Sequence, residues 1–178
     1  KVSNHMSTLS VDTIQGQTAA ANVKFPADNV VQVIKTDDFS VETASFTNIT
    51  GLAATITPKY NTSKILVLIQ CCGGVESNGS YLRLQRGGSN VTLLGDSGGP
   101  VQCTAGVPRA SGGEAVSTTP ILFLDSPTTT SATTYQVQVR KRDGGGNAFR
   151  LNINQDNTTG STDKPRAASS IILMEIQQ

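Results

Sequence analysis

The 178-residue sequence predicts an all-β protein, a β-sandwich with jelly-roll connectivity and an extended N-terminal arm. Two observations lead to this fold class. Short apolar runs rich in Val, Ile, Leu and Thr are separated by clusters of Gly, Asn, Asp and Ser, which is typical of strands joined by turns. Helical periodicity is nearly absent, and many short strands with regular turns favour a sandwich.

The N-terminal segment differs from the rest of the chain. Residues 1–5 resemble a tag remnant, with Met6 as the expected native start, so that the one histidine, His5, is not native. Residues 6–27 are small and polar, with Gly16 and Pro26 as breaks, and can bury little surface alone. We expect an arm or stalk that packs against neighbouring chains, with a disordered leader as the alternative, followed by a head domain over residues 28–178.

Ten segments of the head are predicted strands, because each is rich in β-branched or alternating apolar residues and is bounded by turn residues. In chain order they are residues 30–35, 41–48, 52–57, 64–72, 81–86, 90–94, 119–124, 134–142, 148–154 and 169–176.

Two kinds of pattern occur among these strands. Tyr135, Val137 and Val139 alternate with polar residues, as in a half-buried strand. Residues 65–69 and 171–174 are instead continuously apolar. Such runs are expected where one face of the strand meets the opposite sheet and the other face meets a neighbouring subunit.

Ten short segments share their order and spacing with a known family. They include Ser-Phe-Thr-Asn-Ile-Thr-Gly-Leu at 45–52 and Ser-Ser-Ile-Ile-Leu-Met-Glu-Ile at 169–176, within the set 9–16, 23–27, 30–33, 45–52, 56–59, 63–67, 81–86, 123–127, 133–138 and 168–176. The sequence resembles small tail-fibre or head-fibre-like structural proteins of bacteriophages, especially marine ones, and the resemblance covers nearly the whole chain.

The resemblance implies an N-terminal stalk segment and a compact β head of the C1q and tumour-necrosis-factor type. It implies a homotrimer in the virion, assembled in a bacterial cytoplasm. The arm would bind other virion proteins, and variable loops would meet a host glycan or protein. Two alternatives stay open: a capsid decoration or architectural protein without receptor binding, and a serine protease.

The protease alternative rests on residues 95–100, Gly-Asp-Ser-Gly-Gly-Pro, which copy the nucleophile loop of chymotrypsin-like proteases. In that mechanism a histidine takes the proton of the serine and an aspartate orients the histidine. No native histidine is expected, and Ala21 stands where a faint histidine motif at 17–21 would need its base. We therefore expect no enzyme, and we interpret Ser97 as a hydroxyl of a surface loop.

Composition excludes several classes of partner. The net charge of +1 gives no basic excess for nucleic acid, and no apolar run reaches the roughly 20 residues that span a bilayer. Three cysteines make a poor disulfide framework and favour a reducing compartment. If their strand is regular, Cys71 and Cys72 point to opposite faces, one into the core and one into an interface.

Two further motifs are weak. Residues 152–156 with Asp163 resemble a calcium loop but lack its turn glycine and enough carboxylates, so we expect neither metal nor cofactor. Arg140 and Arg142 could contact a phosphate or glycan from one strand face, although a charged strand end that discourages edge pairing is the preferred interpretation.

Host recognition is expected in four loops, at residues 73–79, 95–113, 143–147 and 156–164, because exposed loops on a rigid scaffold commonly carry binding residues. The candidate binding residues in or beside them are Glu76, Asn78, Asp96, Ser97, Arg109, Arg142, Asp143, Asn147, Asp156 and Asn157.

Overall fold

The computed structural model describes residues 29–74, 79–108, 115–142, 148–154 and 165–178. The proposed tag remnant and arm lie outside these residues. The described part is built from β-strands, and it contains no helix that could cross a membrane. The strands are β1 (Val30–Lys35), β2 (Phe39–Val41), β3 (Thr47–Ile56), β4 (Lys64–Gly74), β5 (Ser80–Arg86), β6 (Ser89–Asn90), β7 (Ala105–Val107), β8 (Ser117–Asp125), β9 (Thr133–Lys141), β10 (Phe149–Leu151) and β11 (Ser169–Ile176).

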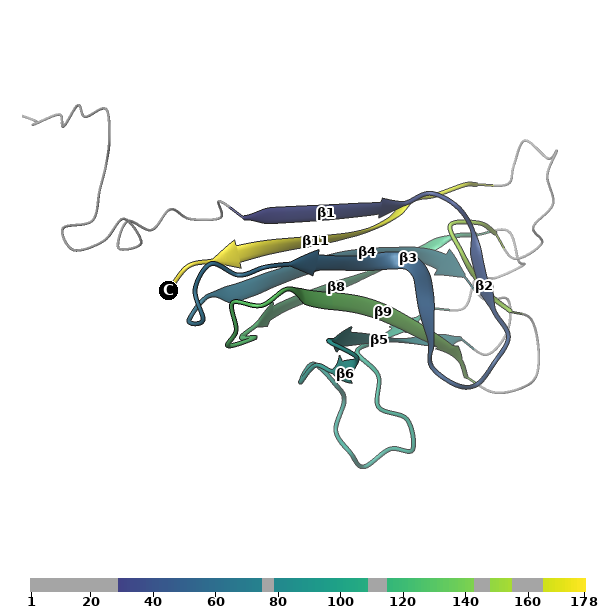
Figure 1. Ribbon diagram of the computed structural model, residues 1–178. Helices are drawn as coiled ribbons and strands as arrows, with labels where there is room; N and C mark the ends of the chain where they lie inside the picture. The colour runs from purple at the N-terminus through teal and green to yellow at the C-terminus, as the bar shows by residue number, and fades with distance from the viewer. Residues whose placement is uncertain (1–28, 75–78, 109–114, 143–147, 155–164) are drawn as a thin grey trace, which may run out of the picture.

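Two antiparallel sheets pack face to face (Figure 1), which confirms the predicted β-sandwich. In sheet I the order is β1-β11-β4-β10-β2, with β8 on the other edge of β4. In sheet II the order is β3-β9-β5-β6, with β7 also paired to β5. The jelly-roll assignment stays a prediction.

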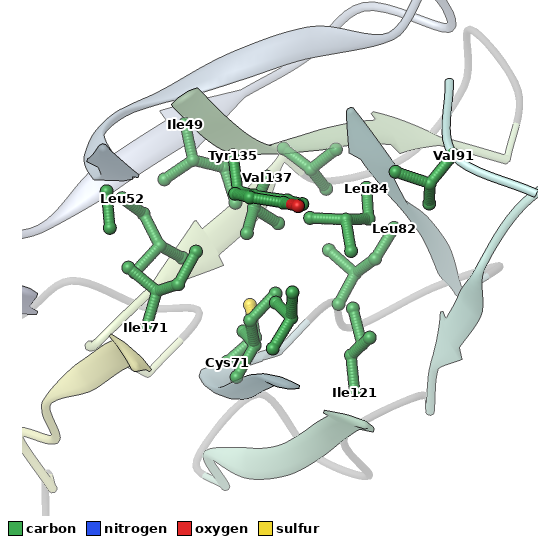
Figure 2. Packing of buried hydrophobic residues seen from close by; sticks show 14 of the residues in the cluster. Ile49, Leu52, Cys71, Leu82, Leu84, Val91, Ile121, Tyr135, Val137 and Ile171 are labelled. Carbon is green, nitrogen blue, oxygen red and sulfur yellow. The ribbon is translucent and has the colours of Figure 1, made fainter. Parts of the chain in front are cut away.

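The core lies between the inner faces of the two sheets (Figure 2). Every second residue of β4, β11 and β9 points into it, as the period of a strand requires. The labelled side chains of Figure 2 are Ile49, Leu52, Leu82, Leu84, Val91, Tyr135 and Val137 on the side of sheet II, and Cys71, Ile121 and Ile171 from sheet I.

Most predicted strands are confirmed. The segments 30–35 and 169–176 have the predicted bounds, and the strands predicted at 64–72, 81–86, 119–124 and 134–142 are found within two residues of theirs. These segments have strong β-branched or alternating patterns, and four of them, β4, β11, β5 and β9, form the centre of the two sheets.

The strand predicted at 41–48 is wrong. Val41 ends β2, which pairs with β10 in sheet I, whereas Thr47 begins β3, which pairs with β9 in sheet II. The residues between them therefore cross from one sheet to the other. The predicted strand 52–57 corresponds to the second half of β3. Gly51 adopts a φ of 82° within a bulge, and β3 continues through this bulge instead of beginning after it.

The strand predicted at 90–94 is also wrong beyond Asn90. Only Ser89 and Asn90 pair with β5, and the chain then leaves the sheet. The structure instead has the short strand β7, whose Ala-Gly-Val sequence gives almost no β signal.

The strand predicted at 148–154 shortens to β10 because Asn152 adopts a φ of 62°. Its buried side chain donates to the carbonyls of Lys35 and Asp37 and accepts from Ser169 Oγ, at 2.7–2.9 Å. Beside it, Gly73 allows β10 to approach β4 closely, since a Cβ there would lie 2.7 Å from the Arg150 carbonyl oxygen. Asn152 is thus a structural side chain; residues 155, 156 and 163 of the calcium-like motif lie outside the described residues.

A second polar cluster joins the two sheets. Asp125, at the end of β8, accepts hydrogen bonds at 2.6 Å from the Tyr135 hydroxyl of β9 and from Arg86 Nη1 of β5. Tyr135 is fully buried, and its burial together with this hydrogen bond raises the pKa of its hydroxyl. Because the acceptor is a carboxylate, these are among the stronger hydrogen bonds of the fold.

A third cluster surrounds the buried carboxylate of Glu175. Burial alone would raise its pKa, but the Ser63 hydroxyl, the Asn29 amide and the backbone N–H groups of Lys59 and Tyr60 favour the ionised form. The pKa is therefore held below its usual value. The cluster ties the end of β11 to the turn between β3 and β4.

Candidate functional site

The outer face of sheet I, which points away from the core, is the first candidate site. Its side chains stand in rows fixed by the strand register, across β1, β11, β4 and β8. We call this surface the apolar face. Its three central rows are Val30–Met174–Leu66–Leu124, Gln32–Ile172–Leu68–Leu122 and Ile34–Ser170–Gln70–Pro120.

Exposed hydrophobic side chains gather on this face. The large hydrophobic residues that are exposed in the described part of the chain are Leu122 (66%), Ile34 (58%), Val30 (51%) and Leu124 (48%), and all four lie in these rows. Isolated exposed hydrophobic residues are common on soluble proteins, but a contiguous set on one face indicates an interaction surface.

The apolar face is also uncharged. Its three central rows, all within the described residues, contain no Asp, Glu, Lys or Arg, and the nearest charge in register is Lys64 at the end of β4. A cavity of about 290 Å³ lies on this side of the sheet, with Leu68, Leu122 and Ile172 in its wall. A flat apolar surface with a hollow can accept a protruding side chain of a partner.

The continuous apolar runs of the sequence belong to this face. As predicted, Ile65, Val67 and Ile69 point into the core against the opposite sheet. Leu66 and Leu68 point outward and are partly exposed. The expected cover by a neighbouring subunit stays a prediction.

The prediction for the cysteine pair is only partly right. Cys71 lies in the core, and burial, with the neighbouring Cys72, raises its pKa to about 12. Cys72 points to the other side of the strand but is also buried, with its Sγ 3.4 Å from Thr118 Oγ1. Cys72 is therefore covered by its own chain and is not free for an interface. All three cysteines are thiols.

The protease-like segment at 95–100 forms an exposed loop between β6 and β7, which projects below the sandwich in Figure 1. Asp96 Oδ1 accepts a hydrogen bond from the Gly98 N–H at 2.6 Å, and the loop closes on itself through Gln102 and the Gly95 carbonyl. Within the described residues, Ser97 Oγ has no hydrogen-bond partner. A catalytic serine needs a base within hydrogen-bond reach.

Three of the ten candidate binding residues fall within the described part of the chain. Asp96 and Ser97 are neighbours on the exposed loop, and Arg142 is exposed one residue beyond the end of β9. Arg140 does not project freely beside Arg142, because its guanidinium donates to the carbonyls of Lys141 and Arg142. Glu76, Asn78, Arg109, Asp143, Asn147, Asp156 and Asn157 lie outside the described residues.

The sequence-based reasoning missed the contribution of β8 to the apolar face. The run Pro120–Ile121–Leu122–Phe123–Leu124 is continuously apolar, like the two runs that were recognised, and could have been found by the same criterion. The contribution of β1 to the apolar face could not be found by this criterion, because the apolar residues of β1 do not form one continuous run.

No family model matches the sequence, and neither does any curated protein sequence. Among solved structures, two of the similar chains come from "Structure of infectious bursal disease virus Gt strain" (13% identity, TM-score 0.42) and from the corresponding Gx-strain structure (12% identity, TM-score 0.38). They cover 95% and 94% of this chain, which spans 43% and 46% of theirs, less than half in each case. Both TM-scores are too low to bear on fold or function.

Proposed function

We propose that this chain is a structural protein of a virion and that its β-sandwich forms a homotrimeric head. The observation that carries the proposal is the apolar face, on which the exposed large hydrophobic residues of the described chain gather. The resemblance to phage fibre proteins along residues 9–176 supports the virion, the bacterial host and the number of three chains. The face itself supports only the presence of a further copy.

Further copies of this chain are the occupant that fits the face best. The face is apolar and uncharged, so that a neighbouring copy in a closed trimer can cover it without leaving a desolvated charge. With strands about 4.8 Å apart and about 3.3 Å per residue, the area over β1, β11, β4 and β8 from Lys64 to Cys72 is roughly 500 Å² in projection. That area is of the same order as the roughly 800 Å² that each partner contributes to a stable interface.

The other parts of the proposal rest on the sequence and on its resemblance to phage fibre proteins. In a head built on the apolar face, the exposed loop at residues 95–100 stays free for contact with a host glycan or protein. The N-terminal arm holds the head to other virion proteins. The protein has no enzymatic activity, and it binds neither nucleic acid nor a membrane.

Sedimentation velocity of the Leu122→Lys variant tests the self-association. A lysine at this position places an unpaired charge in the interface and removes a side chain whose full burial is worth roughly 1.5–3 kcal/mol, so association should weaken at least about tenfold. Thr50→Lys adds the same charge at an exposed position of β3 in sheet II and should leave the oligomer intact. If both variants sediment like the wild type, the apolar face is not the subunit contact.

Placement in the virion needs a separate experiment. Antibodies against the head should label intact particles of the phage that encodes the chain, and unlabelled particles would contradict the proposal. Binding of the isolated head to host cells separates a receptor-binding head from a purely architectural one. Absence of such binding would favour the architectural alternative.

A further inference from the structure

The outer face of sheet II, on the opposite side of the sandwich from the apolar face, carries a different set of side chains. The register places Asn48 of β3, Gln138 of β9 and Arg83 of β5 in one row. Arg140 and Tyr81 stand opposite each other two residues further along. We call this surface the arginine face; it consists of Phe46, Asn48, Tyr81, Arg83, Gln138 and Arg140.

Arg83 is held in a fixed orientation on this face. Its Nε and Nη2 donate to Gln138 Oε1 at 3.1 and 2.9 Å, and its guanidinium carbon lies 3.9 Å from the centroid of the Phe46 ring. Gln138 is fixed in turn, because its Nε2 donates to Asn48 Oδ1 at 2.8 Å. These contacts use one edge of the guanidinium and leave the N–H groups at its far end for another acceptor.

The second guanidinium is held nearby. Arg140 lies 5.8 Å from the centroid of the same Phe46 ring, and its Nε and Nη2 donate to the carbonyls of Lys141 and Arg142. Two positive groups therefore share one aromatic ring, and both are oriented by neutral partners.

Neither positive charge is neutralised in the described part of the chain. Within it, Arg83 and Arg140 form no ion pair, and β3, β5 and β9 contain no Asp or Glu. Partial burial lowers the pKa of Arg83, since its charge is partly removed from water without a carboxylate beside it. An anion that reached the free end of this guanidinium would find its hydrogen-bond donors already in place.

We propose that the arginine face binds a carboxylated sugar, such as a uronic acid residue of a host surface glycan. The carboxylate would bind the far end of the Arg83 guanidinium, where two N–H groups match its two oxygens. Phe46 and Tyr81 offer partly exposed ring surface to the C–H groups of the sugar. Only two guanidiniums are present, which suits a single carboxylate and not the repeated phosphates of a nucleic acid.

The inference rests on the proposed function, because self-association through the apolar face would leave the arginine face exposed on the assembly. Repetition of a weak site on each chain would then raise the total affinity for a glycan chain. Four polar or charged side chains and two aromatic rings are few for tight binding, so a single site should bind a monosaccharide weakly.

The test uses two sugars that differ only at C6, methyl β-D-glucuronide and methyl β-D-glucoside. Both are titrated into the full chain while backbone amide shifts are followed by NMR. The glucuronide should bind at least about tenfold more tightly than the glucoside, the ratio expected from one hydrogen-bonded charge pair. Shifts should centre on Arg83 and its neighbours in β9. Equal binding of the two sugars would overturn the proposal, as would equal competition by inorganic phosphate.

Substitutions locate the site. Arg83→Gln should abolish selection for the glucuronide, and Arg83→Lys should weaken it, because an ammonium keeps the charge but cannot form the two parallel hydrogen bonds. Arg166→Gln removes an exposed positive charge outside sheet II and should leave binding unchanged. Circular dichroism checks that each variant is folded. Unchanged glucuronide binding by folded Arg83→Gln contradicts the assignment, and so does an equal loss in Arg166→Gln.

Light scattering on the same samples separates this inference from the proposed function. A monomer that selects the glucuronide would refute only the assembly. A trimer that binds neither sugar would refute only the carboxylate site.

Discussion

Replacement of Asp125 by Ala should destabilise the sandwich by about 2–3 kcal/mol. The carboxylate of Asp125 accepts from Tyr135 OH and Arg86 Nη1, both at 2.6 Å, and so joins β8 of sheet I to β9 and β5 of sheet II. Both donors reach the same oxygen, Oδ2, so that an alanine removes both acceptor interactions at once and leaves the buried Tyr135 hydroxyl without a partner.

The magnitude follows from the surroundings of each donor. A hydrogen bond from a buried hydroxyl to a charged group is worth roughly 1.5–3 kcal/mol, and the Tyr135 hydroxyl belongs to this class. The Arg86 side chain is 37% exposed, so that water replaces part of the lost ion pair and its share is at most about 1 kcal/mol. For a chain of this length, the sum corresponds to a fall in Tm of roughly 4–10 °C.

Urea denaturation followed by circular dichroism measures the change, with Tyr135→Phe as the comparison. That variant removes the hydroxyl itself and leaves no buried donor unpaired, so it should cost about 1–1.5 kcal/mol, less than Asp125→Ala. A loss below about 0.5 kcal/mol in Asp125→Ala would show that the cluster does not hold the sheets together. An equal loss in both variants would show that Arg86 contributes nothing.

Three further predictions concern single groups. The low pKa of Glu175 contributes stability that is present above the ordinary glutamate pKa of 4.5 and is lost as the pH falls through the lower folded value. The urea midpoint of Glu175→Gln should therefore fall less at acid pH than that of the wild type. Asn152→Ala should cost about 2–4 kcal/mol by the same assay, because it removes buried hydrogen bonds and strains a positive φ, whereas wild-type stability would contradict this role. A thiol reagent at pH 8 should modify Cys103, which is half-buried, before Cys71 and Cys72, which are buried; simultaneous labelling would contradict the packing.

The sequence was sufficient to predict the strands that form the centre of the sandwich. The continuous run at 65–69 and the alternating run from Tyr135 to Val139 each have a pattern that only one strand register satisfies with the core filled. The prediction of one strand at residues 41–48 was wrong, because a segment that crosses between sheets can be as rich in Val, Thr and Phe as a strand. Its two ends pair with β10 and β9, which are far away in sequence.

The candidate sites were harder to predict for a related reason. A loop motif such as residues 95–100 is visible in sequence, whereas a surface made by neighbouring strands depends on register. Arg83, Gln138 and Phe46 come from three separate segments, and only strand pairing brings them together. The apolar face has the same origin, since Val30 and Leu124 meet in one row only through β11 and β4.

The molar mass of the wild-type chain in solution tests the central claim most directly. Light scattering at micromolar concentration should give the mass of three 18.6 kDa chains, and dilution should reduce it toward that of one chain. The Leu122→Lys variant should reach the single-chain mass at a higher concentration than the wild type. A wild-type mass of one chain throughout the micromolar range would contradict the assignment of the apolar face to self-association.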